Sequence, residues 1–312
     1  ISTGMKTTEQ SMTPLTWVLL ITLAAIWGAS FFFARIAVEH VPPMTLVFLR
    51  VFLAAGVLHL YLYGRNDLYG SIATRWPAFL LLGLLNNAIP FSLIFFGQTE
   101  IGAGLAAILN ATTPLCTVVI ANALTTDEKL TMPKVIGCLF GLAGTAVLIG
   151  PSALSGLGAP VWAQLAIVGA AVSYGFAVTY GKRFNDLPPA VTATGQLTAS
   201  SLIMLPLICL LDRPWTLPLP PFEVSMAILM LAVVSTSFAY ILFFTIVSRA
   251  GATNTSLVTL LVPVAAILLG VAFLGETFDI QMLLGLALIG LGLLTIDGRL
   301  GIGMKRKAKT TG

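Results

Sequence analysis

Ten apolar runs, each long enough to cross a bilayer as a helix, follow one another along this chain of 312 residues. A membrane-crossing helix needs about 20 mostly apolar residues. The runs cover residues 14–37, 43–63, 77–98, 101–124, 133–150, 160–181, 189–211, 224–247, 252–274 and 279–297. Only 9% of the residues are charged, whereas about a quarter are charged in a soluble domain. The sequence therefore predicts an all-α integral membrane protein with ten transmembrane helices.

The basic residues are distributed unevenly among the loops between these runs. If the N-terminus is cytoplasmic, thirteen Lys and Arg residues fall on the cytoplasmic side and only Arg213 falls on the other. Cytoplasmic loops carry an excess of Lys and Arg. We therefore expect both termini in the cytoplasm, with an N-terminal tail over residues 1–13 and a basic tail over residues 298–312. The residues ISTG before Met5 are expected to be a cloning remnant.

Composition and missing motifs disfavour several other classes of function. The basic residues flank apolar runs, as lipid headgroups favour, and no basic groove with stacking aromatics is visible, so we expect lipid but no nucleic acid as a partner. Cys116, Cys138 and Cys209 lie singly in apolar runs, which predicts neither disulfides nor a metal site. The sequence contains no HExxH or GxSxG motif, so we expect no enzyme and no cofactor.

A segment in the middle of the chain recurs near its end. Shifting the sequence by 149 residues places Gly102 on Gly251 and Pro114 on Pro263, and a shift of 148 places Glu128 on Glu276. Identity in the flanking region is low, but polar residues fall on polar residues within otherwise apolar runs. Such an alignment would rarely arise by chance, so the chain is expected to be a duplication.

The duplication predicts how the two halves are arranged in the membrane. We expect a first repeat over residues 14–150, an external linker over residues 151–159 and a second repeat over residues 160–297. Five crossings are an odd number, so the second repeat enters the bilayer from the opposite side. Inverted repeats of this kind are typical of secondary transporters, whose substrate sits near the midplane between the repeats. The sequence therefore predicts two inverted five-helix repeats around a central cavity.

The motifs of the two repeats also resemble those of a known family. WGAS begins at Trp27, a proline-containing fourth run is followed by a carboxylate, and this pattern returns as LVPVAAILLGVAFLGE in and just after the ninth run. Together these features resemble the drug/metabolite transporter superfamily, EamA type, and within it bacterial inner-membrane amino-acid exporters of the YddG type. The resemblance implies a basket of ten helices around a central cavity, in the bacterial inner membrane, with no hydrolysed nucleotide.

Polar residues in the middle of helices are the first candidates for a transport pathway, because a buried polar group in lipid requires a partner or water. Trp27 is expected near the membrane midplane, about halfway along its predicted helix, and Tyr174 is the equivalent residue in the second repeat. Each carries a polar tip that a cavity could satisfy. The alternative for both is a ring packed between helices and bonded to a backbone carbonyl.

A second pair of candidates precedes the two repeat-related prolines. Asn110 and Thr259 each lie four residues before a proline, Pro114 or Pro263. Proline lacks the amide that would bond the carbonyl four residues earlier. We therefore expect a helix break at each proline and a substrate clamp made of side chain and freed carbonyl, with interhelical packing as the alternative.

The third and eighth runs complete the predicted substrate site. Residues four apart share a helix face, which places Phe91 with Asn87 and Tyr240 with Thr236, and Asn86 lies beside Asn87. This neutral surface of polar and aromatic groups suits a small zwitterion or an amphipathic metabolite.

Charged residues within the predicted membrane layer are scarce. Arg50 lies inside the second run, and either a substrate carboxylate or a structural partner such as a carbonyl or Glu100 would account for it. Glu128 and Glu276 follow the fourth and ninth runs, at the predicted membrane interface, and are interpreted as structural. The glycines of the fifth and tenth runs are expected to let those helices pack closely, or to pack against a second copy in a homo-oligomer.

We therefore expect a secondary transporter or facilitator that exports small organic solutes by alternating access, with amino acids, including aromatic ones, as substrates. A drug-efflux protein or another metabolite carrier of the same superfamily is the alternative. A membrane-embedded enzyme is a third and weaker one.

Overall fold

The computed structural model describes residues 12–64, 66–101, 103–149, 160–265 and 280–296, and every regular element in these ranges is helical. Six helical segments are long and apolar enough to cross a membrane: Pro43–Tyr61, Trp76–Glu100, Leu105–Leu124, Val161–Phe184, Pro189–Leu211 and Phe222–Ser256. Three shorter apolar helices accompany them: Pro14–Ser30, Met132–Val147 and Leu283–Ile296. The all-helical, multi-pass prediction is confirmed for these ranges. The run expected over residues 252–274 extends beyond them, so the number ten stays a prediction.

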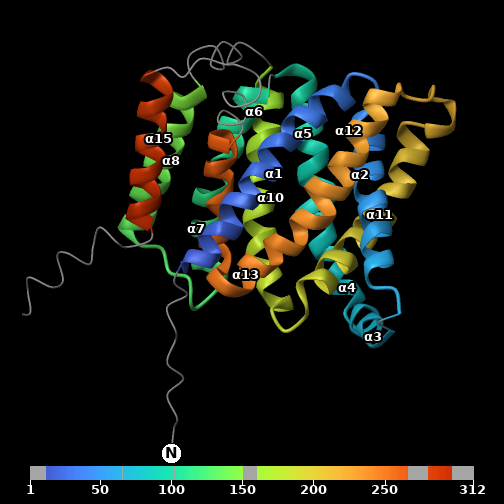
Figure 1. Ribbon diagram of the computed structural model, residues 1–312, viewed down its shortest axis with the longest axis horizontal. Helices are drawn as coiled ribbons and strands as arrows, with labels where there is room; N and C mark the ends of the chain where they lie inside the picture. The colour runs from blue at the N-terminus through green and yellow to red at the C-terminus, as the bar shows by residue number, and fades with distance from the viewer. Residues whose placement is uncertain (1–11, 65, 102, 150–159, 266–279, 297–312) are drawn as a thin grey trace, which may run out of the picture.

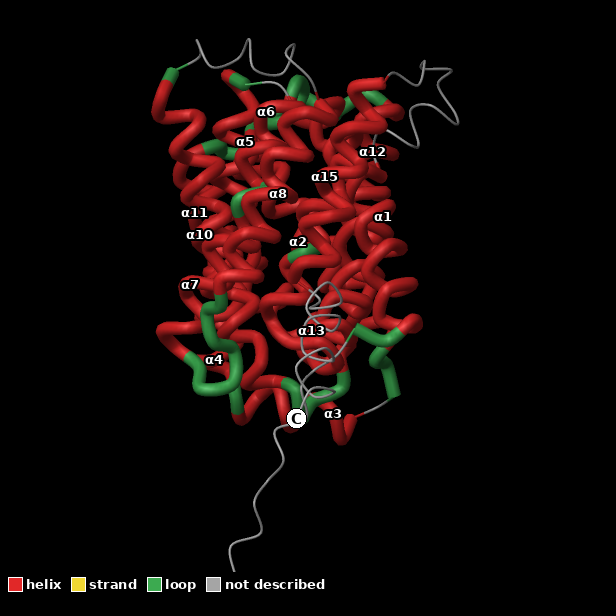
Figure 2. The backbone as a smooth tube through the Cα atoms, turned by 90° about the vertical axis from the view of Figure 1, so that its left-hand side faces the viewer, coloured by secondary structure: helices red, strands yellow, loops and turns green. Residues whose placement is uncertain are grey.

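The helices run up and down along a common axis (Figures 1 and 2). In the first half of the chain they are α1 (Pro14–Val38), α2 (Pro43–Tyr61), α3 (Asn66–Thr74), α4 (Trp76–Gly83), α5 (Ile89–Glu100), α6 (Ala103–Asn110), α7 (Thr113–Leu124) and α8 (Met132–Ile149). In the second half they are α10 (Val161–Gly181), α11 (Pro189–Leu211), α12 (Phe222–Ala232), α13 (Ala239–Ser256) and α15 (Ile280–Ile296). The short helix α3, between the second and third predicted runs, was not expected.

Prolines fix where several helices begin. Pro43 begins α2 and Pro189 begins α11, and a shift of 146 residues places the pair Pro42-Pro43 on Pro188-Pro189. Proline suits the first turn of a helix because the amide it lacks has no partner there in any case. The paired prolines therefore set equivalent helix starts in the two halves.

Each half contains a π-helical turn at an equivalent place. The segment Leu84–Ala88 joins α4 to α5, and the segment Val233–Phe238 joins α12 to α13. The same shift of 149 residues that aligns the repeats carries Leu84 onto Val233. A π-turn widens the helix by one residue and frequently occurs at functional sites. Both turns hold residues that the sequence had marked as site candidates.

The helical structure is interrupted at two further places. A turn at residues 111–112 separates α6 from α7, and α13 is kinked at Gly251, whose φ is 80° and ψ is 177°. A side chain rarely tolerates that backbone conformation, which explains a glycine here. The helical residues 252–256 therefore start in a new direction, while Gly102, its repeat mate, lies outside the described residues.

Helices α8 and α15 pack side by side through their glycines, as expected. A Cβ added at Gly292 would lie 2.5 Å from the carbonyl oxygen of Gly137, and one added at Gly144 would lie 2.8 Å from that of Gly285. Small residues allow such close backbone approach in membrane helices. Gly290 differs, because a Cβ added there would meet nothing within 4 Å.

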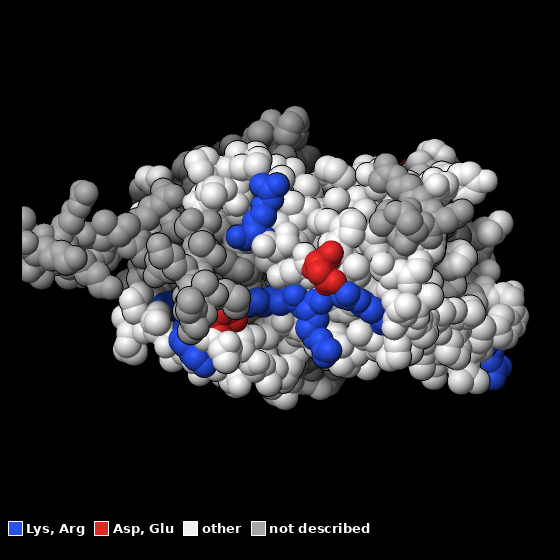
Figure 3. Space-filling view, turned by 90° about the horizontal axis from the view of Figure 1, so that it is seen from below, with Lys and Arg blue, Asp and Glu red and all other residues white. Residues whose placement is uncertain are grey.

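Basic side chains gather on the face where α1 begins. Figure 3, which views the molecule from that side, shows Lys and Arg residues across it. This face holds the loop ends next to α4, α7, α10 and α13, whereas the connection between α11 and α12, which contains Arg213, lies at the opposite end (Figure 1). Six of the thirteen basic residues expected on the cytoplasmic side belong to or adjoin these loop ends: Arg75, Lys129, Lys134, Lys182, Arg183 and Arg249. The other seven lie outside the described residues, so the cytoplasmic position of the termini stays a prediction.

Candidate functional site

A cavity lies in the middle of the bundle, between elements from both halves. Its wall combines aromatic, aliphatic and polar side chains: Trp27, Ser30, Ala34, Arg50, Asn86, Phe91, Ile94, Phe95, Gln98, Asn110, Thr113, Tyr174, Val178, Tyr240, Phe243, Ser256, Val258, Thr259 and Val262. The centre of a water molecule has about 80 Å³ in which to move, whereas one water needs roughly 10–15 Å³. The cavity therefore has room for several waters or a small organic molecule.

The wall includes seven of the nine predicted substrate-binding residues. They are Trp27, Asn86, Phe91, Asn110, Tyr174, Tyr240 and Thr259. Four further polar residues of the wall were not predicted from the sequence: Ser30, Gln98, Thr113 and Ser256. Their spacing on helices resembles that of ordinary packing residues, so no signal in the sequence separates them from the rest.

An aromatic cluster forms one side of the cavity. The ring centroid of Trp27 lies 6.4 Å from that of Tyr240 and 5.8 Å from that of Phe243. The indole Nε1 donates a hydrogen bond of 3.2 Å to the carbonyl of Ser235 in the second π-turn. Trp27 thus faces the cavity and also bonds a backbone carbonyl, so the two alternatives for this residue occur together.

Arg50 of α2 reaches the cavity from within the bundle. Its Nε donates to the hydroxyl of Thr236 at 2.8 Å, its Nη2 donates to the carbonyl of Ser235 at 3.3 Å, and its guanidinium carbon lies 4.0 Å from the centroid of the Phe91 ring. The residue is 6% exposed. Its structural partners are therefore a hydroxyl, a carbonyl and a ring, and Glu100 is not among them.

Asn110 offers the cavity an unused acceptor. Its side-chain Oδ1 is buried and has no hydrogen-bond partner among the described residues. Its carbonyl, however, accepts a bond of 2.6 Å from the hydroxyl of Thr113. The expectation of a freed carbonyl at Asn110 was wrong, because a neighbouring threonine replaces the missing amide donor.

The two prolines lie differently from one another. Pro114 stands in the first turn of α7, directly after the turn at residues 111–112, in agreement with a break there. Pro263 lies within the helical residues 258–265, and the turn comes earlier, at Leu257. The predicted break at Pro263 is therefore absent from the described residues, and Thr259 contributes its side chain to the wall.

Two predicted residues pack behind the wall and do not line it. Asn87 is fully buried, donates to Ser200 at 2.8 Å and accepts from Tyr240 at 2.5 Å. Thr236 is also fully buried, and its hydroxyl donates to the carbonyl of Leu231 at 2.7 Å while accepting from Arg50. These residues position the wall from behind.

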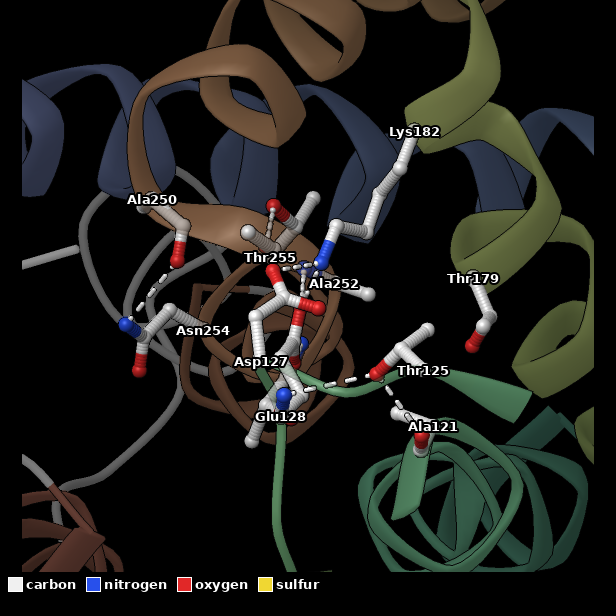
Figure 4. Close-up of polar contacts among 12 residues, drawn as sticks. Ala121, Thr125, Asp127, Glu128, Thr179, Lys182, Ala250, Ala252, Asn254 and Thr255 are labelled. Carbon is white, nitrogen blue, oxygen red and sulfur yellow. Dashed lines mark hydrogen bonds and ion pairs between the residues drawn. The ribbon is translucent and has the colours of Figure 1, made fainter. Parts of the chain in front are cut away.

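A polar cluster joins the two halves at the basic face (Figure 4). Both oxygens of Glu128, in the loop after α7, accept backbone amides at the α13 kink, from Ala252 and Thr253 at 2.8 Å each. The hydroxyl of Thr253 also donates to Glu128. Lys182, at the end of α10, pairs with Glu128 at 3.1 Å and with Asp127 at 2.5 Å. We call Asp127, Glu128, Lys182, Ala252 and Thr253 the basic-face latch.

The latch keeps its carboxylates ionised. Burial alone would raise the pKa of Glu128, but hydrogen bonds from Thr253 and Ala252 and the charge of Lys182 outweigh it and hold that pKa below its usual value. The hydrogen bond from Lys182 lowers the pKa of Asp127. Glu128, which was predicted to be structural, thus has specific partners in the other half of the chain, Ala252 and Thr253.

Comparisons with known proteins give matches over most of the chain. The profile of the EamA-like transporter family matches twice, over residues 15–150 and 161–296. A Bacillus subtilis protein named uncharacterized transporter YoaV is 23% identical over 88% of this chain and 94% of its own. An Escherichia coli K12 protein named uncharacterized inner membrane transporter YedA is 30% identical over 83% of each chain.

The fold also resembles a solved crystal structure, with a TM-score of 0.71 over 90% of this chain and 97% of that one. The two sequences are 21% identical, so this likeness concerns the fold alone.

Proposed function

The chain belongs to the EamA-like transporter family, and we propose that it is a secondary carrier that exports small organic solutes across a bacterial inner membrane by alternating access. Amino acids, including aromatic ones, are the proposed substrates. We further propose ten crossings in two inverted repeats, over residues 14–150 and 160–297, with both termini in the cytoplasm. The doubled family match and the basic face of Figure 3 support this arrangement.

The observation that carries the proposal is the cavity between the two halves. Its aromatic residues present apolar surface, while Arg50, Asn110 and Thr259 present polar groups. Sites for small amphipathic molecules combine these features: mostly apolar walls and a few placed polar groups. Such a wall suits an amino acid better than a bare ion.

The basic-face latch supports the alternating-access part of the proposal. It joins the α7–α8 loop of the first half to the α13 kink of the second, while the cavity wall extends along α1 and α5 to Ala34 and Gln98, toward the opposite face. A carrier that opens to the cytoplasm must then separate Glu128 from Ala252 and Thr253. The latch would be the inner closure of an outward-facing state.

Counterflow in proteoliposomes tests the proposal. Vesicles loaded with an unlabelled amino acid should accumulate the same labelled amino acid, and empty vesicles should not. A panel of aromatic, aliphatic and charged amino acids, with cationic drugs and nucleotide sugars, separates the substrate classes. Accumulation of drugs or sugars alone would favour a different carrier of the superfamily. Failure of every solute would reject the carrier function.

A further inference from the structure

The strongest unexplained feature of the cavity is a buried cation that has no counter-ion in the part of the chain that the structure describes. None of the ion pairs among the described residues includes Arg50. Its partners Thr236 and Ser235 are neutral, and Phe91 supplies only the face of a ring. A buried charge is costly unless it is paired. Among the described lining residues of the cavity, Arg50 therefore contributes a single positive charge, and the others are neutral.

The guanidinium also has donors to spare. Arginine carries five N–H donors, and the bonds to Thr236 and Ser235 use those of Nε and Nη2. Nη1 makes no hydrogen bond with the described residues, and Arg50 lines the cavity. The bonds behind it and the ring of Phe91 fix the plane of the group. The fixed end of a guanidinium matches the two oxygens of a carboxylate, to which arginine binds strongly and with a preferred geometry.

The surroundings indicate what kind of anion fits. A bare inorganic anion would need polar partners on all sides, whereas Trp27, Phe91, Tyr240 and Phe243 give the cavity an aromatic wall. The unpartnered Oδ1 of Asn110 is an acceptor and calls for a donor on the ligand. A solute with a carboxylate, a donor group and an apolar body would satisfy all three.

We propose that Arg50 is the carboxylate receptor of the substrate site and that its charge makes the carrier selective for organic carboxylates. This inference rests on the proposed carrier function and deepens it. Neutralised by the ligand, Arg50 becomes part of an ion pair. An analogue of the same shape without the carboxylate leaves the charge unpaired and should bind more weakly.

The test uses three probes of similar shape: L-phenylalanine, L-phenylalaninamide, which lacks the carboxylate, and 3-phenylpropionate, which lacks the amino group. Binding to the purified full-length protein is measured by titration calorimetry. The wild type should bind both carboxylates at least about tenfold more tightly than the amide. The Arg50→Gln variant should lose this preference by weakening the carboxylates, with the amide unchanged. Arg50→Lys, which keeps the charge but not the fork, should lie between them.

Arg249→Gln is the matched control, because Arg249 is exposed on the basic face and its loss should leave the preference unchanged. Equal binding of the three probes by the wild type would overturn the inference without any variant. A preference for the carboxylate probes that survives Arg50→Gln would also overturn it. So would a wild type that loses phenylalanine binding when chloride is added but binds phenylalanine and its amide equally well. Because binding is measured without transport, probes that bind selectively but fail in counterflow would reject the carrier function alone.

Discussion

The hydroxyl of Tyr240 donates a hydrogen bond of 2.5 Å to Oδ1 of Asn87. Both residues are predicted substrate contacts, and the structure shows that they contact each other across the two halves of the chain. Because Asn87 is fully buried, its oxygen has no access to water if this donor is removed. The bond therefore joins the first π-turn to α13 and is expected to support the cavity wall.

Tyr240→Phe should destabilise the protein by about 1–3 kcal/mol, the cost of leaving a buried acceptor unsatisfied. Thermal unfolding in detergent, followed by tryptophan fluorescence, measures the change. Tyr63→Phe is the control, since Tyr63 is 85% exposed and its hydroxyl should contribute less than about 0.5 kcal/mol. Equal melting temperatures for the Tyr240→Phe variant and the wild type would show that the bond does not hold the halves together.

Asn110→Ala should impair transport without loss of stability. Its Oδ1 has no partner among the residues that the structure describes, so its removal leaves none of their groups unsatisfied, whereas a substrate donor would lose an acceptor. Initial counterflow rates should fall about tenfold, further when Thr259→Val is added, while the melting temperature stays equal or rises. A variant with normal transport would reduce Asn110 and Thr259 to packing residues.

The basic-face latch should make stability depend on acid. Glu128 has a lowered pKa in the folded protein, so its contribution is present above the unfolded value of 4.5 and disappears as the pH falls through the lower folded value. Glu128→Gln should cost about 3 kcal/mol at neutral pH, because it breaks a mostly buried pair, and should flatten the acid limb of the stability curve.

Melting temperatures between pH 7 and pH 3, roughly the range that spans both forms of a carboxyl, measure this effect. Asp127→Asn provides the comparison, since Asp127 sits on the same loop but its side chain is 45% exposed and exposed pairs contribute only about 0–1 kcal/mol. If the stability curves of Glu128→Gln and Asp127→Asn had indistinguishable acid limbs, the bonds from Glu128 to the second half of the chain would not stabilise the fold.

Glycine contact between α8 and α15 predicts opposite behaviour at two nearby positions. Gly292→Ala would place a methyl group 2.5 Å from the backbone oxygen of Gly137 and should cost about 1–3 kcal/mol by overpacking. Gly290→Ala meets nothing within 4 Å, so the higher helix propensity of alanine should leave stability equal or slightly raised. The pair is compared by thermal unfolding, and similar losses at both positions would contradict the packing described here.

The sequence predicted a structural feature correctly wherever a residue pattern has a single physical explanation. Apolar runs located the helices, and repeat-related polar residues such as Trp27 and Asn110 pointed to the centre. The π-turns escaped prediction because nothing in LLNNA or VVSTSF separates a widened turn from an α-helix. The hydrogen-bond partners of Arg50 and Glu128 could not be predicted from the sequence either. Arg50 meets a carbonyl and a hydroxyl from the other half, and the amides that Glu128 binds are exposed only by the kink at Gly251.

Access to the cavity decides whether a wet chamber between the two halves carries the solute. In a background without Cys116, Cys138 and Cys209, the Ser30→Cys variant places a thiol on the cavity wall, and Val119→Cys places one on α7 at a position that is 57% exposed and is expected to face lipid. A charged methanethiosulfonate is applied to proteoliposomes before amino-acid counterflow is measured. We expect that the Ser30→Cys variant is modified and stops exchanging, that an excess of transported amino acid protects it, and that the Val119→Cys variant is unaffected. An unreactive Ser30→Cys variant, or one that exchanges normally after full modification, would contradict it.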